Sequence, residues 1–384
     1  MKVGRAHVTG AALLGAACGG WDALPAPPPP ELRVVGDHIE DRDGNRVFLR
    51  GVNRSGTEYR CVQANPETSD EHGFFDGPGD EESVRVMATW NINAVRVPLN
   101  ETCWLGINGV EERFSGENYH AAIRDYVRLL HAYGLIPILD LHWAAPADFQ
   151  ARRLQPMPNA DHSPEFWRSV AETFKDDERV IFELYNEPFP YSNADSNPAW
   201  DCWRNGCEVD FAVRAGETSV PYFAAGMQEL VSAVRGTGAR HLLLLGGVRY
   251  SNALTQWLEH RPVDPLGNVA AAWHVYNTNP CADLECWDGV PAEVASTVPV
   301  VATEVGQNDC GDQPFVGPLL DFIDEHADGH LAWSWNAYGA CRPTGTTEGR
   351  PNPWSLVTDY ATGTPNGTYA ETFYGHLETH RAPE

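Results

Sequence analysis

The sequence predicts an α/β protein: a (β/α)8 TIM barrel with an N-terminal β-hairpin covering the barrel floor and with long βα loops. Eight short apolar runs alternate with amphipathic segments, which is typical of repeated βα units around a parallel sheet. Polar side chains follow several of these runs, at the strand ends where parallel barrels keep their chemistry. No Gly-x-Gly-x-x-Gly follows the first run, so an open dinucleotide-binding sheet is disfavoured.

The strands are predicted from runs of four to eight residues rich in β-branched and aromatic side chains. Residues 32–39 and 46–50 flank the turn signal Asp43-Gly44-Asn45, so they are expected to form the floor hairpin and to lead into the first barrel strand. The eight barrel strands are predicted at residues 49–53, 94–99, 136–142, 180–186, 241–245, 269–275, 298–303 and 330–335.

Amphipathic helices are predicted between the strands. In residues 119–130 the apolar side chains recur every three or four residues, as in a helix that packs on one face. Other helices are expected to start at Glu82, Glu165, Val220, Ala253 and Pro314, with a short one at 292–297 and a last one at 369–380. The βα connections at about 54–80, 143–163, 189–219 and 276–291 are long enough to be expected as functional walls or lids.

Two segments precede the barrel. Residues 1–20 combine early basic residues with a small apolar stretch too short to span a bilayer, so they are predicted to be a signal peptide. Cys18 follows Leu14-Gly-Ala-Ala17, which faintly resembles a lipoprotein cleavage site and makes a lipid anchor at Cys18 the alternative. Residues 21–30 are predicted to be a Pro-rich extended spacer, and residues 31–384 the barrel domain. The protein is therefore expected to be secreted or held at the cell surface.

The remaining cysteines are even in number, which favours disulfides in an exported chain. In two cases only four residues separate neighbouring cysteines, so these cysteines are expected to bond to each other. The pairing of the other four cysteines is a guess, because eight cysteines allow many connectivities. The predicted pairs are Cys61 with Cys103, Cys202 with Cys207, Cys281 with Cys286, and Cys310 with Cys341. A zinc site made of these thiols is disfavoured because it would prefer two-residue spacings.

The charge balance limits the partners. Lys plus Arg total 27 against 53 Asp plus Glu, a net charge of −26, which repels nucleic acid and acidic polymers. Neutral polymers remain compatible, and a monomer is expected. The 13 Trp, 13 Tyr and 14 Phe supply flat faces on which sugar rings can stack, although most aromatic residues of any chain are core.

Two glutamates end predicted strands. Glu187 lies in Ile181-Phe-Glu-Leu-Tyr-Asn-Glu-Pro188, and Glu304 in Val298-Pro-Val-Val-Ala-Thr-Glu-Val-Gly306. One such carboxylate is about as often a loop anchor as a functional group, but two in one barrel suit cleavage of a glycosidic bond. One of them must then hold a proton while the other stays ionised, so their neighbours must separate their pKa values.

Further polar residues share this rim because they end other strands: Asn53, Arg96, His142, Asn186, His274, Tyr276, and Trp333 or Trp335. Arg96 and the Tyr276 hydroxyl are expected to keep Glu304 charged, and His274 to tune Glu187. The Asn186 amide can donate to a sugar 2-hydroxyl. A residue of any one of these types at a strand end more often has a structural role than a functional one, but the convergence of all of them at one rim indicates a functional site.

On these residues the chain resembles glycoside hydrolase family 5, the cellulase-like retaining barrels of clan A. The resemblance covers residues 31–382, and every position of the family pattern is present. It implies that Glu187 is the acid/base and Glu304 the nucleophile. It assigns substrate binding or support to Arg96, His142, Asn186, His274 and Tyr276, and it places the sugar platform at Trp333 rather than Trp335.

The resemblance implies a secreted retaining hydrolase of β-1,4-linked polysaccharide or oligosaccharide, foremost an endo-β-1,4-glucanase, with no cofactor and no metal. The alternatives are a β-mannanase or another β-glycanase of the family, and less favoured a non-catalytic sugar-binding barrel. Aromatic residues near the rim that could stack on sugars are Trp104, Trp143, Trp200, Trp203, Trp287 and Tyr338, although packing beneath loops explains each at least as well. The missing Gly-x-Ser-x-Gly and His-Glu-x-x-His motifs disfavour a serine hydrolase and a zinc peptidase.

Overall fold

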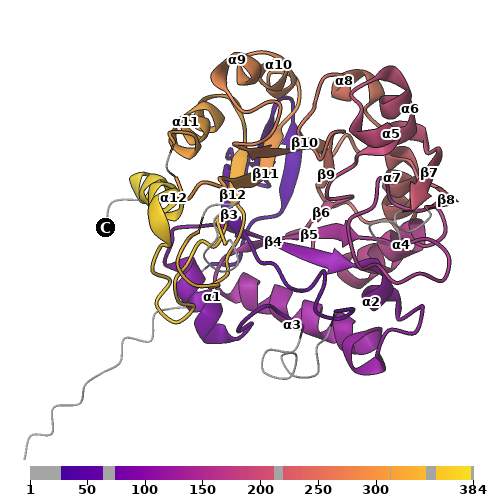
Figure 1. Cartoon of the computed structure of the whole chain (residues 1–384), viewed down its shortest axis with the longest axis horizontal. Helices are drawn as coiled ribbons and strands as arrows, with labels where there is room; N and C mark the ends of the chain where they lie inside the picture. Colours follow the sequence, from indigo (N-terminus) through magenta and orange to yellow (C-terminus); the bar gives the residue numbers. More distant parts are fainter. Residues whose placement is uncertain (1–26, 64–73, 212–218, 312, 343–351, 382–384) are drawn as a thin grey trace, which may run out of the picture.

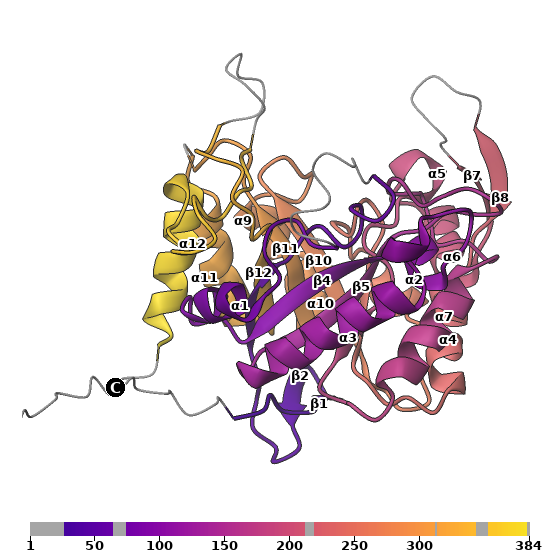
Figure 2. The same cartoon turned by 90° about the horizontal axis from the view of Figure 1, so that it is seen from below.

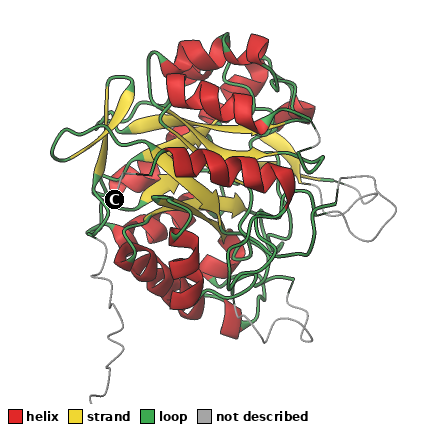
Figure 3. Cartoon of the chain, turned by 90° about the vertical axis from the view of Figure 1, so that its left-hand side faces the viewer, coloured by secondary structure: helices red, strands yellow, loops and turns green. Residues whose placement is uncertain are grey.

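A computed structural model describes residues 27–63, 74–211, 219–311, 313–342 and 352–381. Eight parallel strands close into a barrel in the order β10-β11-β12-β3-β4-β5-β6-β9, and helices surround it (Figures 1 and 3). This is the architecture that the alternating runs predict. The predicted signal peptide, Cys18 and most of the predicted spacer lie outside the described residues.

The element bounds agree with most of the predicted ranges. The strands are β1 Leu32–Val35, β2 His38–Asp41, β3 Leu49–Asn53, β4 Ala94–Asn100, β5 Ile136–Trp143, β6 Ile181–Glu183, β7 Glu208–Phe211, β8 Val220–Phe223, β9 Leu243–Gly246, β10 Val269–Tyr276, β11 Val300–Gly306 and β12 Gly329–Ala332. The helices are α1 Glu81–Ala88, α2 Glu101–Leu105, the 3-10 turn η1 Glu112–Phe114, α3 Glu117–Ala132, α4 Ser163–Phe174, α5 Pro190–Asn193, α6 Asn197–Asn205, α7 Met227–Gly236, α8 Trp257–His260, α9 Leu284–Trp287, α10 Val290–Ala295, α11 Val316–His326 and α12 Gly367–Thr379.

The barrel interior changes from apolar to polar along the strands. In β4 the side chain of Ala94 joins the apolar cluster inside the barrel, while Val95 and Val97 join the cluster between strands and helices. Because side chains alternate along a strand, Arg96 points inward one step above Ala94. The same alternation places Glu183 above Ile181, so the upper half of the interior is lined by buried charged groups.

The N-terminal segment covers the floor, as predicted, but it contains one more turn than predicted. Strands β1 and β2 pair antiparallel with Val35 opposite His38, so the chain first reverses at Gly36-Asp37. Gly36 has a positive φ of 64°, which glycine adopts at little cost. The predicted turn at Asp43-Gly44-Asn45 follows, with Glu40 and Arg46 bridged antiparallel across it and the Asp41 carboxylate accepting from the Asp43 and Asn45 N–H groups. Leu32 and Ile39 close the interior apolar cluster from below, and the hairpin lies under the barrel (Figure 2).

Two of the predicted helix starts are wrong. Residues 220–223 form β8, which pairs with β7 as an antiparallel hairpin in the long connection after β6, and helix α7 begins only at Met227. The alternation at Val220-Pro-Tyr-Phe223 buries Tyr222 and exposes its neighbours, which is a strand pattern. Helix α8 is a single turn that begins at Trp257, because Ala253 itself is paired with Val248 in an antiparallel bridge and therefore cannot start the helix.

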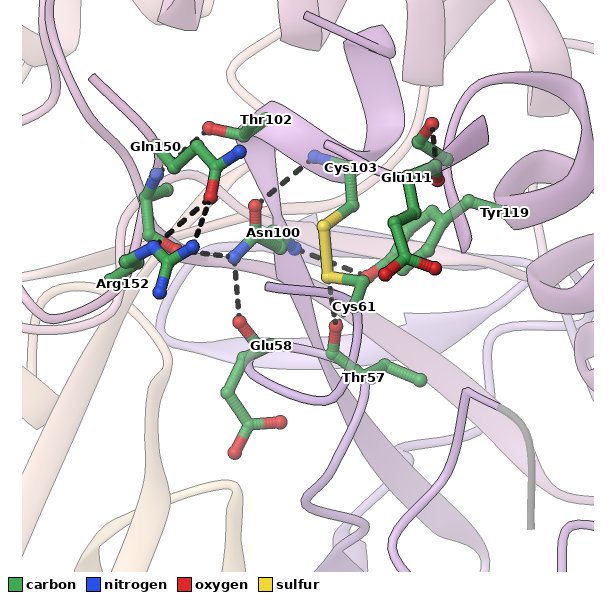
Figure 4. The surroundings of a disulfide bond; sticks show 12 residues. Thr57, Glu58, Cys61, Asn100, Thr102, Cys103, Glu111, Tyr119, Gln150 and Arg152 are labelled. Carbon is green, nitrogen blue, oxygen red and sulfur yellow. Dashed lines mark hydrogen bonds between the residues drawn. A yellow bond between two sulfur atoms is a disulfide. The ribbon is translucent and has the colours of Figure 1, made fainter. Parts of the chain in front are cut away.

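Four disulfides pin the loops above the barrel. They join Cys61 with Cys103, Cys202 with Cys207, Cys281 with Cys286 and Cys310 with Cys341, which are the predicted pairs. Figure 4 shows the first, which ties the loop after β3 to helix α2. Beside it the Asn100 side chain caps α2 through the Cys103 N–H and donates to the Glu58 carbonyl, so the loop is fixed at the barrel rim.

No helix among the described residues is long and apolar enough to cross a membrane.

Candidate active site

The predicted polar rim forms a pocket at the carboxyl ends of the barrel strands. Its volume is about 300 Å³, and it is lined by His142, Asn186, Glu187, Tyr276, Thr278, Asn279, Glu304, Trp333 and Trp354. These residues come from β5, β10 and β11 and from the loops after β6, β10 and β12. Parallel strands place their carboxyl ends at one rim, which is why residues far apart in the sequence meet here.

Glu187 and Glu304 face each other across this pocket. A carboxylate oxygen of each and a ring nitrogen of His274 all lie within 4.8 Å of one another. The Glu304 side chain is 5% exposed and the Glu187 side chain 20% exposed. The two carboxylates therefore share a small polar space that opens to solvent on the side of Glu187.

Glu304 is held as an anion. Arg96 Nη1 donates to its Oε1 at 2.8 Å, and the Tyr276 hydroxyl donates to its Oε2 at 2.5 Å. Burial raises the pKa of Glu304, but the charges of His274 and Arg96 outweigh it, so the net pKa lies below the ordinary 4.5. Gly306 makes room for this contact, because a Cβ there would lie 2.3 Å from Tyr276 Cε1.

Arg96 organises the buried polar layer through four hydrogen bonds and a further close ion pair. Nε donates to Glu183 at 2.6 Å, and Nη1 donates to Asn53 at 3.0 Å and to Glu304. Nη2 donates to Asn186 at 2.7 Å and lies 2.9 Å from Asp140. A rigid guanidinium fork can serve five acceptors at once, whereas an ammonium group has three donors.

His274 connects Glu187 to this layer. The Thr303 hydroxyl donates to Glu183 at 2.8 Å, so its oxygen is free to accept from His274 Nε2–H at 3.1 Å. Nδ1 then faces Glu187 Oε1 at 3.1 Å. Burial lowers the pKa of His274, but Glu304, Glu183 and Glu187 raise it to about 10, so the ring carries a proton.

Glu187 has the opposite tendency to Glu304. Burial raises the pKa of Glu187 above the ordinary 4.5, and the negative charge of Glu304 adds to the rise, while the hydrogen bond from His274 opposes it. The two facing carboxyl groups therefore have pKa values displaced in opposite directions. One is suited to hold a proton and the other to remain ionised.

His142 supports the pocket wall. Its Nδ1 lies 2.7 Å from Asp140 Oδ2, and burial lowers its pKa to about 3, so the ring is neutral. The imidazole stacks parallel to the Trp333 indole, with ring centroids 5.5 Å apart and planes 10° apart. His142 thereby fixes the orientation of a half-buried aromatic face in the pocket.

The structure shows which of the predicted rim aromatic residues line the pocket and which are buried in the core. Trp335 is fully buried against Trp90, so Trp333 is the strand-eight indole that faces the pocket. Trp104, Trp200, Trp203 and Trp287 are buried, and their rings contact aromatic residues of other helices or of their own helix rather than the pocket. Trp143 is half-buried near Tyr59, whose hydroxyl lies 2.9 Å from that of the exposed Tyr338.

Several site residues were not predicted. Asp140, Glu183 and Thr303 occupy inward positions of strands whose alternation is visible in the sequence, so a charged or hydroxyl residue at such a position was an available signal. Trp354 lines the pocket from the loop after β12 and lies edge-on to Tyr276 at 6.2 Å. That loop has no periodic pattern, and the sequence offers no signal for Trp354.

Glu187, His274 and Glu304 are close enough to share a metal ion, but their charges are already balanced. The protonated imidazole lies between the two carboxyl groups, 3.1 Å from Glu187 and 3.6 Å from Glu304. An imidazolium in that position supplies the positive charge that a cation would otherwise bring.

Comparisons with known proteins show the family to which the chain is similar. A model of the family described as cellulase (glycosyl hydrolase family 5) matches residues 52–339. Endoglucanase A of Butyrivibrio fibrisolvens is 25% identical over 251 residues, which are 64% of this chain and 45% of that protein. A mannan endo-1,4-beta-mannosidase of Streptomyces lividans is 21% identical over 319 residues, 80% of this chain and 67% of that protein.

The fold is shared with solved structures. The beta-glucanase SdGluc5_26A of Saccharophagus degradans, solved in complex with cellotetraose, superposes with a TM-score of 0.64 at 17% identity and covers 91% of this chain and 94% of its own. The chain spans about half the length of the first curated relatives it matches.

Proposed function

The chain belongs to the cellulase family, glycosyl hydrolase family 5, and from this premise we propose that it hydrolyses β-1,4-linked polysaccharide with retention of anomeric configuration, foremost as an endo-β-1,4-glucanase. The observation that carries the proposal is the pair of carboxyl groups with oppositely displaced pKa values less than 5 Å apart. Retaining glycosidases hold such groups about 5 to 5.5 Å apart, whereas inverting enzymes leave about 6.5 to 9.5 Å for a water.

In the first step Glu304 is the nucleophile. Its carboxylate oxygen attacks the anomeric carbon, the glycosidic C–O bond breaks, and the leaving oxygen takes the proton of Glu187. Arg96 and Tyr276 hold Glu304 ionised and aimed at the sugar. In the second step Glu187, now a carboxylate, removes a proton from water, the water oxygen bonds to the anomeric carbon, and the electron pair of the ester bond returns to Glu304.

The pocket walls bind the sugar at the reacting position. The Trp333 face, fixed by His142, offers a stacking surface for the ring, and Trp354 closes the same side. The Asn186 side chain accepts from Arg96 through its oxygen, so its amide N–H groups remain to donate to a sugar 2-hydroxyl. A net charge of −26 fits a neutral glucan better than an acidic one.

Secretion is part of the proposal. Four disulfides are consistent with an oxidising, extracellular setting. A β-glucan polymer is also an extracellular substrate.

The substrate class is tested with a panel of soluble polymers. We expect reducing sugar to be released fastest from carboxymethylcellulose or mixed-linkage β-glucan, more slowly from glucomannan, and least from xylan. A β-mannanase, the second candidate because a mannosidase is among the relatives, would reverse the order of the first two. The Glu304→Gln variant, purified in parallel, is the control: any reducing sugar that it releases measures contaminating hydrolases. A sugar-binding barrel without catalysis would release nothing from any polymer.

The pH dependence of kcat/KM is expected to be bell-shaped. Activity should fall at acidic pH as Glu304, whose pKa lies below 4.5, gains a proton, and at alkaline pH as Glu187, whose pKa lies above 4.5, loses its proton. Glu187→Gln should lower turnover of unactivated oligosaccharides about 10²- to 10⁴-fold and should abolish the alkaline limb. Aryl cellobiosides with good leaving groups should lose less, because they need no protonation. An alkaline limb that persists in this variant would contradict the role of Glu187.

A further inference from the structure

Outside the pocket, three histidines and an aspartate gather on the outer wall of the barrel. Asp324 belongs to α11, and His376 and His380 are one turn apart at the end of α12, which lies beside α11 (Figures 1 and 2). A carboxylate oxygen of Asp324 and one ring nitrogen of each of these two histidines lie within 4.8 Å of one another. Asp324 Oδ2 is 3.0 Å from His376 Nε2 and 2.7 Å from His380 Nε2.

A second observation points into the same cluster. His330 of β12 is fully buried, and neither of its ring nitrogens has a hydrogen-bond partner among the described residues. Its Nε2 lies 3.9 Å from Asp324 Oδ1, and its ring meets that of His376 edge-on at 5.4 Å. Asp324 Oδ1 is likewise buried without a hydrogen bond among the described residues. Buried polar atoms nearly always have a partner, so the His330 nitrogens and this neighbouring oxygen call for one.

We propose that Asp324, His376 and His380 bind a divalent transition metal ion, zinc foremost, with His330 as the fourth ligand after a small rotation of its ring. Imidazole nitrogens with one carboxylate oxygen form a donor set that suits zinc, whereas calcium and magnesium require oxygen. Tetrahedral zinc separates neighbouring ligand atoms by about 3.3 Å. His376 Nε2 and His380 Nε2 lie 3.0 and 2.7 Å from Asp324 Oδ2, and His330 Nε2 lies 3.9 Å from the other oxygen, Oδ1, so shifts of about 1 Å or less would bring each pair to that spacing.

The surroundings admit the ion. A histidine ligand binds metal through a ring nitrogen that carries no proton, and both ring nitrogens of the buried His330 are without a hydrogen-bond partner among the described residues. Arg50 Nη2 lies 3.2 Å from His380 Nδ1 and would have to withdraw, since that nitrogen carries a proton when Nε2 binds metal. The Arg50 side chain is half-buried and its guanidinium lies over the Phe48 ring at 4.3 Å, so binding of the ion would require the guanidinium to rotate toward solvent.

The ion would act as a structural clasp, meaning a cross-link between elements that are distant in the sequence. The ligands come from α11, α12 and β12, so one ion would tie the last helix of the chain to the barrel wall. His330 is the second residue of β12, on the helix side and near the floor end of the strand, opposite the catalytic rim. In barrels of this kind the floor end serves stability rather than chemistry. The clasp should therefore change the melting temperature and leave kcat unchanged.

The test uses the full chain without a histidine tag, freed of metal by chelator and dialysis. Titration with Zn²⁺ followed by calorimetry should show one tight site, and Co²⁺ should give the visible absorption of tetrahedral coordination. Saturating Zn²⁺ should raise the melting temperature by about 3–5 °C. Ca²⁺ and Mg²⁺ at the same concentration should not.

Variants locate the site. His376→Ala/His380→Ala should weaken the tight Zn²⁺ site at least about 100-fold and abolish both the cobalt spectrum and the thermal shift. His326→Ala, at the end of α11 but outside the cluster, is the matched control and should keep all three. His380→Gln, at a partly exposed position, repeats the test should the double variant fold poorly.

Two results would overturn the proposal: the absence of stoichiometric Zn²⁺ binding, or binding that survives His376→Ala/His380→Ala. None of these readouts involves hydrolysis, so they are independent of the proposed function. Zn²⁺ held instead at Glu187, His274 and Glu304 would inhibit hydrolysis and survive the double variant, which counts against the clasp.

Discussion

Glu304→Gln is expected to lower kcat/KM on every hydrolysed glucan by at least about 10⁴-fold while leaving oligosaccharide binding within a few-fold of the unmodified protein. An amide cannot form the glycosyl ester, so the first step loses its nucleophile, and losing one member of a catalytic unit costs several orders of magnitude. Glutamine has the same shape and still accepts from Arg96 Nη1, so the pocket should persist. Initial rates on soluble glucan and calorimetry with cellotetraose measure the two quantities.

Two controls sharpen this result. Glu259→Gln changes an exposed glutamate on α8 and should leave the rate unchanged. With Glu304→Ala and an activated aryl glycoside, added azide can occupy the vacated space and attack from that face, which gives a glycosyl azide of inverted configuration. An unchanged rate in Glu304→Gln, or an azide product of retained configuration, would remove Glu304 from the role of nucleophile.

Arg96→Met is expected to have the largest effect on the fold of any single substitution in the site, lowering the free energy of unfolding by about 3–5 kcal/mol. It removes five donors and leaves Glu183, Glu304 and Asp140 buried without their shared cation. Activity should also be lost, because Glu304 would no longer be held ionised. Urea denaturation at neutral pH measures the stability.

The loss from Arg96→Met should depend on pH in a defined direction. Burial raises the pKa of Glu183, but Arg96 and His274 lower it by more than burial raises it. The pKa in the folded protein is therefore about 2, against 4.5 in the unfolded chain. A depressed pKa stabilises the fold above pH 4.5, and this contribution disappears as the pH falls toward about 2. Arg96→Met should thus cost most at neutral pH and less in acid. A cost that does not shrink in acid would contradict this account.

A matched substitution separates stability from activity. Arg235 of α7 makes a bidentate, buried pair with Asp264 of the loop between α8 and β10, at 2.8 and 3.0 Å, away from the pocket. Arg235→Met should also destabilise the fold but should keep its activity per folded molecule. Arg96→Lys keeps the charge with three donors in place of five, so it should recover part of the stability and little activity.

Much of the site could be predicted because, in a parallel barrel, the place of a residue along its strand determines which end of the barrel it lies at. A polar residue at the carboxyl end of a buried strand must reach the common rim, so Arg96, His142, Asn186 and Glu304 could be brought together without coordinates. The turn at Gly36-Asp37 and the strand at residues 220–223 were not predicted, because short turns and strands differ little in local preference and packing on the barrel determines which of them forms.

The sequence by itself determined the barrel, the two carboxylates and the members of the rim, because strand alternation and strand ends are local properties of the chain. Tertiary structure confirmed the preference for Trp333 over Trp335 as the residue that faces the pocket, and it alone showed that Trp354 joins the pocket from an irregular loop. It also decided the direction of each pKa. A pKa depends on which charges lie within a few ångströms and how much water is excluded, and Arg96, His274 and Glu304 become neighbours only when the barrel closes.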